Sequence, residues 1–336
     1  MKKGCGKYTA VSGTAELRAA AAAEMNAAHG TKHAAENVIV SVGAKHSLFN
    51  LFMAMLDDGD EVIVPSPCWV SYPEMVAIAG GKPVLVDTVP DDGYQLHYES
   101  LARAVTAKTR LIVLNSPCNP TGAVYDKSSM EAVARVMREH TELCVVTDDI
   151  YRRLVYDVAW LSLCRIAPDI ADRVLLVDGV SKSYAMTGWR IGFTAGPPAL
   201  IKAMDTLQGQ STTNPAAVAQ AAALAALTGS QESVSAMHAE FDKRRRVMVD
   251  GLRAIPKVKL HEPRGAFYCF PDVSAYVGGK VKDDLALSEW ILDKGRVAVV
   301  PGSGFFAPGF IRLSYATSMA NVTEGVRRIG EALAQL

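Results

Sequence analysis

Short apolar, β-branched runs alternate with helix-forming segments along the first 150 residues of the chain. Such alternation is typical of an α/β fold with a mainly parallel sheet covered by helices on both faces. Ligands of such sheets bind beyond the carboxyl ends of the strands, so we expect ligand-binding and catalytic residues directly after strands. The expected strand and helix pairs are 38–42 with 48–56, 61–65 with 69–79, 84–87 with 98–105, and 111–115 with 128–140, followed by a strand at 143–147.

The second half of the chain predicts two further strands and then a change of architecture. Strands are expected at 174–177 and 193–195, and helical sequence runs from 198 to about 251 with breaks at Asn214-Pro215 and Gly229-Ser230. The segment 231–253 is expected to bridge into a smaller α+β domain. Its parts would be 258–260, 266–270, 285–293, 297–300, 310–314 and 321–336. We therefore predict a large domain, 1–235, with a sheet of the seven-stranded type, and a small domain, 236–336.

Charge and cysteine content restrict the function classes. The chain has 336 residues with 35 acidic and 35 basic side chains, so no net field attracts nucleic acid or an anionic membrane. The basic run Lys243–Arg246 is interpreted as a solvated helix face. Six scattered cysteines without paired spacing predict free thiols and no metal site. No membrane span or signal region is recognised, so a cytoplasmic protein is expected.

Lys182 follows the apolar run 174–177 and stands eight residues before Arg190, among small residues. Beside a buried strand the pKa of a lysine falls, and its free amine becomes a nucleophile toward carbonyls. Arg190 can act as a planar fork for a phosphate. A surface lysine and arginine flanking a glycine loop would explain Ser181-Lys182 alone, but the longer pattern up to Gly192 is more specific.

That pattern resembles the lysine signature of class I and II aminotransferases, the fold-type I enzymes that use pyridoxal 5′-phosphate. The chain is most similar to the bacterial-type aspartate aminotransferase and aspartate/prephenate aminotransferase subgroup. The resemblance extends from Tyr8 to Leu336 and rests on five further motifs, which occur in order: Gly43-Ala44-Lys45, Pro67-Cys68-Trp69-Val70-Ser71-Tyr72-Pro73, Ser116-Pro117-Cys118-Asn119-Pro120-Thr121-Gly122, Asp148-Asp149-Ile150-Tyr151 and Arg312-Leu313-Ser314-Tyr315-Ala316-Thr317.

The resemblance implies a cofactor phosphate site built from several segments. Residues 43–45 lie in a strand-to-helix turn, where free backbone N–H groups favour an anion, although such turns are common. Gly43, Ala44 and Lys45 are expected near the cofactor phosphate, together with Arg190. Without the resemblance, Tyr8 would be interpreted as an ordinary exposed tyrosine. The resemblance implies that it reaches the phosphate of a neighbouring subunit in a homodimer.

Four other residues are expected around the cofactor ring. The resemblance implies that Trp69 stacks on the ring, that Asn119 and Tyr151 bind its phenolic oxygen, and that Asp148 keeps its nitrogen protonated. From the residues alone, Trp69 could be core packing, Asn119-Pro120 a turn and Asp148 a cap. Many relatives have asparagine at the position of Cys118.

Substrate contacts and catalysis are also implied by the resemblance. Arg312 would grip the α-carboxylate bidentately. Lys45 would approach a distal carboxylate, and Trp69 and Asn119 would border the substrate. Lys182 would bind the cofactor and then act as general base, with Asp148 and Tyr151 as its catalytic partners. This predicts ping-pong transamination of aspartate or glutamate with 2-oxoglutarate or oxaloacetate; prephenate stays open as an acceptor.

Two alternatives also stay open. A C–S β-lyase would release pyruvate and ammonia from a cysteine conjugate without any oxo acid, and a non-catalytic cofactor-binding paralogue would not turn over. Relatives carry some tens of residues before the position of Tyr8, including a loop over the substrate and part of the small domain. We expect that segment to be missing here, which puts activity and dimer stability in question and would hide any upstream targeting segment.

Overall fold

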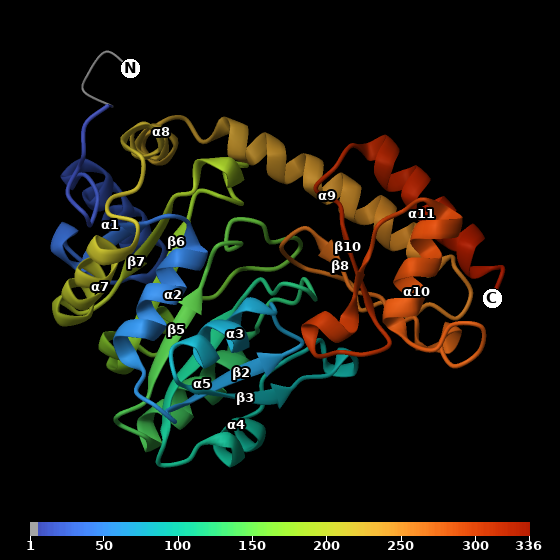
Figure 1. Ribbon diagram of the computed structural model, residues 1–336, viewed down its shortest axis with the longest axis horizontal. Coiled ribbons are helices and arrows are strands. Elements are labelled where there is room, and N and C mark those ends of the chain that lie inside the picture. The colour runs from blue at the N-terminus through green and yellow to red at the C-terminus, as the bar shows by residue number, and fades with distance from the viewer. Residues whose placement is uncertain (1–5) are drawn as a thin grey trace.

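A seven-stranded sheet forms the larger part of the molecule in the computed structural model, which describes residues 6–336. Its strand order is β1-β7-β6-β5-β4-β2-β3. Figure 1 shows this sheet with β7, β6, β5, β2 and β3 labelled. The pairings of β2 with β3 and β4, of β4 with β5 and of β5 with β6 are parallel, whereas β7 is antiparallel to both β1 and β6. The predicted mainly parallel α/β sheet is therefore confirmed.

The elements of this part lie close to the predicted ranges. The strands are β1 Val38–Ser41, β2 Glu61–Ser66, β3 Lys82–Asp87, β4 Thr109–Asn115, β5 Cys144–Asp148, β6 Val174–Gly179 and β7 Gly192–Ala195. The helices are α1 Ala15–His29, α2 Ala44–Met55, α3 Ser71–Ile78, α4 Tyr98–Ala104, α5 Lys127–Glu139, α6 Leu163–Ile166, α7 Pro198–Ser211 and α8 Ala217–Thr228.

Successive residues of a strand point to opposite faces of the sheet. Apolar side chains therefore lie on both faces, and helices cover both of them. Ile63, Ile112 and Val145 belong to a core with α1, α5 and α8, whereas their chain neighbours Val62 and Val146 pack with α2, α3 and α7. Burial of apolar side chains on both faces explains why the strands read as continuous β-branched runs.

Helix α5 shows how local sequence sets one of these elements. The Asp126 carboxylate caps its start by accepting a hydrogen bond from the Ser129 backbone N–H at 2.8 Å. Met130, Val133 and Met137 then recur at helical spacing and are buried against the sheet.

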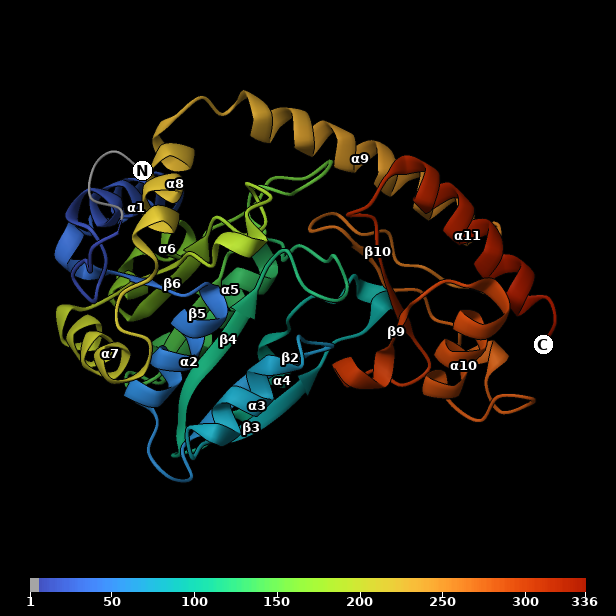
Figure 2. The same cartoon turned by 45° about the horizontal axis from the view of Figure 1, so that its top comes forward.

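A second, three-stranded antiparallel sheet lies at the far end of the long helix α9 Glu232–Arg253 (Figure 2). Its order is β8-β10-β9, with bounds β8 Tyr268–Cys269, β9 Val300–Pro301 and β10 Ile311–Ser314. Helices α10 Asp284–Trp290 and α11 Met319–Leu333 complete this part. The predicted boundary at residues 235 and 236 remains a prediction.

The structure corrects several expectations for this part. Residues 258–260, one of the expected parts of the small domain, form neither a helix nor a strand, and Lys259 makes only an isolated bridge with Asp272. The helix expected at 285–293 ends earlier and continues as a π-turn, Ile291–Gly295. The interpretation of the basic run as a solvated face holds for Lys243 and Arg246, which are exposed, but is wrong for Arg245, which is only 1% exposed. Periodicity does not reveal it, since acidic partners from other segments surround this arginine.

Within residues 6–336 the five cysteines are free thiols, and no group of three or more potential ligands could hold a metal ion. No helix in this part of the chain has both the length and the apolar character needed to cross a membrane.

Candidate active site

A cavity of about 330 Å³ lies beyond the carboxyl ends of the central strands, where the two sheets face each other. It brings together residues from α2, the segments after β2, β4, β5 and β6, and strand β10. Nine of the predicted site residues line it: Ala44, Lys45, Trp69, Asn119, Asp148, Tyr151, Lys182, Arg190 and Arg312.

Asp148 is the last residue of β5, the middle strand of the sheet, and its carboxylate is buried at the base of the cavity. The Tyr72 hydroxyl donates to its Oδ2 at 2.6 Å, and the Ile150 N–H donates to its Oδ1 at 3.3 Å. Burial raises the pKa of Asp148 to about 6, although Tyr72 and Lys182 favour the ionised form. The site therefore contains a carboxylate that titrates close to neutral pH.

Lys182 follows β6 by three residues and faces the same cavity. Its Nζ lies 5.7 Å from the ring centroid of Tyr151 and 5.5 Å from that of Phe267. Burial lowers the pKa of this amine; Arg312 and Arg190 lower it further, while Asp148 opposes them. The amine is thereby shifted toward the neutral form that attacks carbonyls, as the sequence predicts.

Tyr151 connects the two sheets at the cavity. Its hydroxyl lies 2.8 Å from the hydroxyl of Tyr268, which belongs to β8 of the small sheet. The Tyr151 side chain is buried, and burial raises its pKa well above the ordinary value. The phenol therefore stays protonated and can donate a hydrogen bond.

Arg312 is on β10 and enters the cavity from the small sheet. Its guanidinium lies between two aromatic rings, 4.6 Å from the centroid of Tyr268 and 4.8 Å from that of Phe305. Its Nη1 donates to Oδ1 of Asn119 at 2.8 Å, and the Asn119 N–H donates to Oδ1 of Asn115 at 2.9 Å. The planar fork is thus fixed in orientation, as bidentate binding of a carboxylate requires.

The turn between β1 and α2 forms an anion cradle. Gly43 has φ +85°, and a Cβ there would lie 2.5 Å from Nη2 of Arg190. The Arg190 guanidinium is held in this place by the backbone oxygens of Thr187 and Val42, at 3.0 and 3.4 Å. The guanidinium therefore lies beside the start of α2, where unsatisfied backbone N–H groups favour an anion.

Lys45 and Trp69 form one wall of the cavity. The Lys45 Nζ lies 4.7 Å from the Trp69 ring centroid, and the Trp69 ring meets Tyr72 edge-on with 5.3 Å between centroids. The cation therefore lies over an aromatic face and remains exposed to a substrate.

Tyr8 is 89% exposed and does not line this cavity, so its predicted contact with a second subunit remains a prediction. Sequence reasoning missed six lining residues, Tyr72, Asn115, Ile150, Ser181, Thr187 and Tyr268. Asn115 had a usable signal, since it ends the predicted strand 111–115, and Ser181 directly precedes the predicted Lys182. Tyr72 stands three residues after Trp69, which places the two on neighbouring positions of a helical turn.

Pyridoxal phosphate fits the residues that line this cavity. The glycine cradle with Arg190 suits its phosphate, buried Asp148 suits its ring nitrogen, and Lys182 offers the amine that its carbonyl requires. The side chain at position 43 is restricted to hydrogen because any larger group would occupy the place of the guanidinium.

Comparisons with known proteins agree with this geometry. The model of the family described as aminotransferase class I and II matches residues 1–329. The aspartate/prephenate aminotransferase of Nitrosomonas europaea is 40% identical, over 99% of this chain and 86% of its own length. The aspartate aminotransferase of Geobacillus stearothermophilus is 42% identical, over 98% of this chain and 84% of its own length.

Solved structures give the same result. The Thermus thermophilus aspartate aminotransferase with maleate has a TM-score of 0.90 at 44% identity, covering 97% of this chain and 84% of that one. The Rhizobium meliloti aspartate aminotransferase has a TM-score of 0.95 at 40% identity, covering 99% and 85%. The chain therefore belongs to the class I and II aminotransferases, enzymes that use pyridoxal phosphate to transfer an amino group between an amino acid and a 2-oxo acid.

Proposed function

We propose that the chain transfers the amino group of aspartate or glutamate to a 2-oxo acid, such as 2-oxoglutarate or oxaloacetate. The observation that carries the proposal is the presence of two cations, Lys45 and Arg312, in the cavity that contains Lys182. An amino acid with two carboxylates can pair with both of them. The Thermus structure is described with maleate, itself a dicarboxylate, which supports this substrate class.

The residues that meet the cofactor have distinct roles in this proposal. Bound pyridoxal phosphate supplies a carbonyl for the amine and a protonated ring that takes up electrons from the substrate. Gly43, Ala44 and Arg190 hold its phosphate, and Asp148 faces its ring nitrogen. The Lys182 Nζ holds the cofactor and, once displaced, accepts the proton from the substrate Cα.

The remaining residues orient the ring and the substrate. Trp69 covers the ring face, and Tyr151 donates to the ring oxygen. Arg312, oriented by Asn119, binds the substrate α-carboxylate with both nitrogens of its fork. Lys45 leaves the Trp69 face to meet the distal carboxylate, so a substrate without that group gains nothing from it.

Prephenate is a second candidate acceptor, since it also carries two carboxylates. The relative from Nitrosomonas is named for aspartate and prephenate. Three aromatic side chains, Trp69, Tyr268 and Phe305, lie against the two cations and could contact its ring.

We further propose a homodimer in which Tyr8 of a second copy reaches the phosphate site. The exposure of Tyr8 supports this arrangement, as does a mainly apolar hollow beside Lys45 and Arg190 that is lined by Phe49, Met75 and Ile78.

The division into domains 1–235 and 236–336 is proposed from the two separate sheets. A cytoplasmic location is proposed from the free thiols.

The decisive experiment follows the absorbance of the chain loaded with pyridoxal phosphate. L-Aspartate should convert the absorbance band, and 2-oxoglutarate should restore it, with prephenate tested as an alternative acceptor. Lys45→Met should raise KM for aspartate about tenfold, the equivalent of one charge-assisted contact, and leave KM for alanine unchanged. Lys127→Met, which removes a lysine of the α5 surface, is the control.

Two outcomes would contradict the proposal. Equal effects of Lys45→Met on aspartate and alanine would remove the role assigned to Lys45. Release of pyruvate and ammonia from a cysteine conjugate, without any requirement for an oxo acid, would instead favour a C–S β-lyase.

A further inference from the structure

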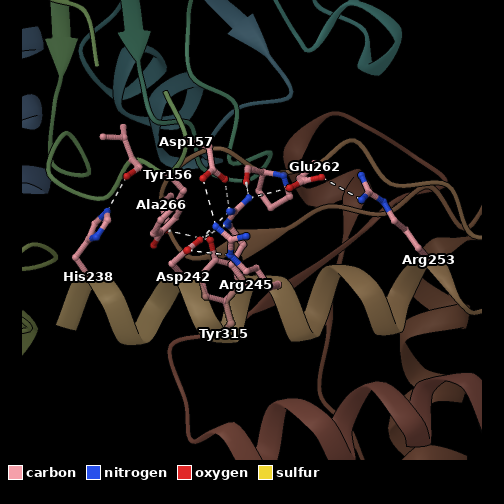
Figure 3. Close-up of polar contacts among 12 residues, drawn as sticks. Tyr156, Asp157, His238, Asp242, Arg245, Arg253, Glu262, Ala266 and Tyr315 are labelled. Atoms are coloured by element: carbon pink, nitrogen blue, oxygen red, sulfur yellow. Dashed lines mark hydrogen bonds and ion pairs between the residues drawn. The ribbon is translucent and has the colours of Figure 1, made fainter. Parts of the chain in front are cut away.

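Arg245, in the middle of α9, is a cation buried among three acids from different segments (Figure 3). It pairs with Asp157, with Asp242 at 2.7 Å and with Glu262 at 3.0 Å, and it donates to the Pro263 carbonyl oxygen at 3.2 Å. A buried arginine with this number of partners fixes the relative positions of the segments that carry them.

Two of those segments lead directly to the active site. Asp157 lies in the loop that begins after Asp148 and contains Tyr151, and Glu262 precedes the segment 264–268. The two segments are also joined by backbone hydrogen bonds of 2.8 Å, from the Tyr156 N–H to the Arg264 oxygen and from the Ala266 N–H to the Leu154 oxygen. These two segments therefore form a junction that is held by Arg245 at one end and by the hydroxyl pair of Tyr151 and Tyr268, in the cavity, at the other.

Ala266 is the residue at which this junction turns toward the cavity. It has φ +56°, a left-handed conformation that costs free energy for alanine. Its carbonyl oxygen accepts hydrogen bonds from the Tyr156 hydroxyl at 2.8 Å and the Tyr315 hydroxyl at 3.2 Å. The Arg245 guanidinium lies 5.0 Å from the ring centroid of Tyr156, so the arginine packs against the side chain whose hydroxyl binds the Ala266 oxygen (Figure 3).

The two residues after Ala266 flank the reacting groups. The Phe267 ring lies 5.5 Å from Nζ of Lys182, and the Tyr268 ring lies 4.6 Å from the Arg312 guanidinium. A shift of Ala266 would therefore move the neighbours of both the amine and the carboxylate fork.

We propose that Arg245 is a positioning residue for transamination: through Tyr156, Asp157 and Ala266 it sets the placement of Phe267 and Tyr268 against Lys182 and Arg312. This inference rests on the catalytic roles proposed above for Lys182 and Arg312. It assigns a function to the one arginine of the run 243–246 that is not solvated.

The test compares Arg245→Met with Arg246→Met. Arg246 is the matched control because it contacts the same two acids, Asp157 at 3.3 Å and Asp242 at 3.0 Å, yet is 60% exposed. We expect Arg245→Met to lower kcat/KM about 100-fold, the cost of roughly an ångström of misplacement, with a rise in KM for the amino acid. Arg246→Met should change kcat/KM by no more than about twofold.

A second readout separates positioning from mere stability. The rate at which the stripped chain captures added pyridoxal phosphate depends on the deprotonated amine of Lys182, whose charged neighbours are Asp148, Arg312 and Arg190. Loss of the aromatic cover should let water reach the amine and move the midpoint of this pH dependence up by about one unit. The midpoint of Arg246→Met should stay at the wild-type value. Arg245→Lys should restore part of the effect, since it keeps the charge without the fork.

The pH midpoint of cofactor capture requires no substrate, so its outcome is separable from failure of the proposed substrate class. If Arg245→Met lowers only the melting temperature and shares midpoint and KM with Arg246→Met, Arg245 is structural and the inference is wrong. If Arg245→Met does not fold, the double variant Tyr156→Phe, Tyr315→Phe, which removes both hydroxyls from Ala266, must show the same upward shift. A wild-type midpoint and KM in that variant would overturn the proposal.

Discussion

Asp148 and Lys182 show how two ordinary side chains acquire chemistry from their places in the sheet. Each follows or ends a central strand, and each is shifted mainly by burial, which raises the pKa of the acid to about 6 and lowers that of the amine. Each also favours the charged form of the other. The site therefore combines an acid and a base that titrate toward neutrality, the range in which proton transfer is efficient.

Tyr72 is the residue that most directly supports the charge on Asp148. Its hydroxyl donation favours the carboxylate, so Tyr72→Phe should raise the pKa of Asp148 above about 6. A hydrogen bond to a charged group contributes about 1.5–3 kcal/mol, which corresponds to roughly one to two pKa units. We expect pyridoxal phosphate to bind more weakly to Tyr72→Phe, with a deficit that grows as pH falls from 8 to 6.

Titration of cofactor affinity against pH checks this prediction. Tyr125→Phe is the control, because Tyr125 is also a buried tyrosine but lies outside the cofactor cavity. A deficit in Tyr72→Phe that is constant with pH would show that the hydroxyl acts by packing alone.

The turn between β1 and α2 is the element that would join the sheet to the cofactor phosphate in the proposed site. Its function depends on backbone: a residue at φ +85° and a helix start that points its N–H groups outward. Strand β7 packs directly against this turn, since a Cβ on Gly192 would lie 2.2 Å from the Ala44 nitrogen.

Gly43→Ala should weaken cofactor binding about tenfold or more, because the new methyl group displaces the Arg190 guanidinium and a charge-assisted contact with it. Gly59→Ala is a matched control, since Gly59 has φ +84° but open space around it. Both variants should lose similar folding stability from backbone strain, about 1–2 kcal/mol. Equal loss of cofactor affinity in the two would mean that strain, and not Arg190, accounts for the effect.

The molecule as a whole carries a stability cost for its buried acid in the absence of cofactor. The pKa of Asp148 is about 6 in the folded chain against an ordinary 3.8, a difference equivalent to about 3 kcal/mol. Between these values the folded chain keeps a proton that the unfolded chain releases, so stability falls as pH rises. Below pH 3.8 the effect is absent, and above pH 6 it is complete.

Asp148→Asn should therefore stabilise the cofactor-free chain relative to wild type by an amount that grows from pH 4 to 6 and is then constant. Urea unfolding over this range measures the difference. Asp169→Asn is the control. It should lower the free energy of unfolding relative to wild type, because Arg138 lowers the pKa of exposed Asp169 and so favours its charged form in the folded chain. A difference between Asp148→Asn and wild type that does not vary with pH would contradict the titration described here.

Local sequence accounts for the strands, most helices and the majority of the site. Apolar runs of β-branched residues end at Asn115, Asp148 and Gly179, and parallel strands bring their carboxyl ends to one edge. Residues 43–45, Trp69, Asn119 and Lys182 follow strands, so their meeting could be predicted before any contact was known. The resemblance to aminotransferases then added their chemical roles.

The sequence alone determined the α/β architecture, the family and most of the residues that line the cavity, because these depend on periodicity and on motifs that are contiguous in the chain. Only the tertiary structure decided that Tyr72 supports Asp148, that Tyr268 and Phe305 enclose Arg312, and that Arg245 is buried. The physical reason is the same in each case. A side chain's burial and charge state depend on partners far away in sequence, and helical periodicity does not indicate which partners those are.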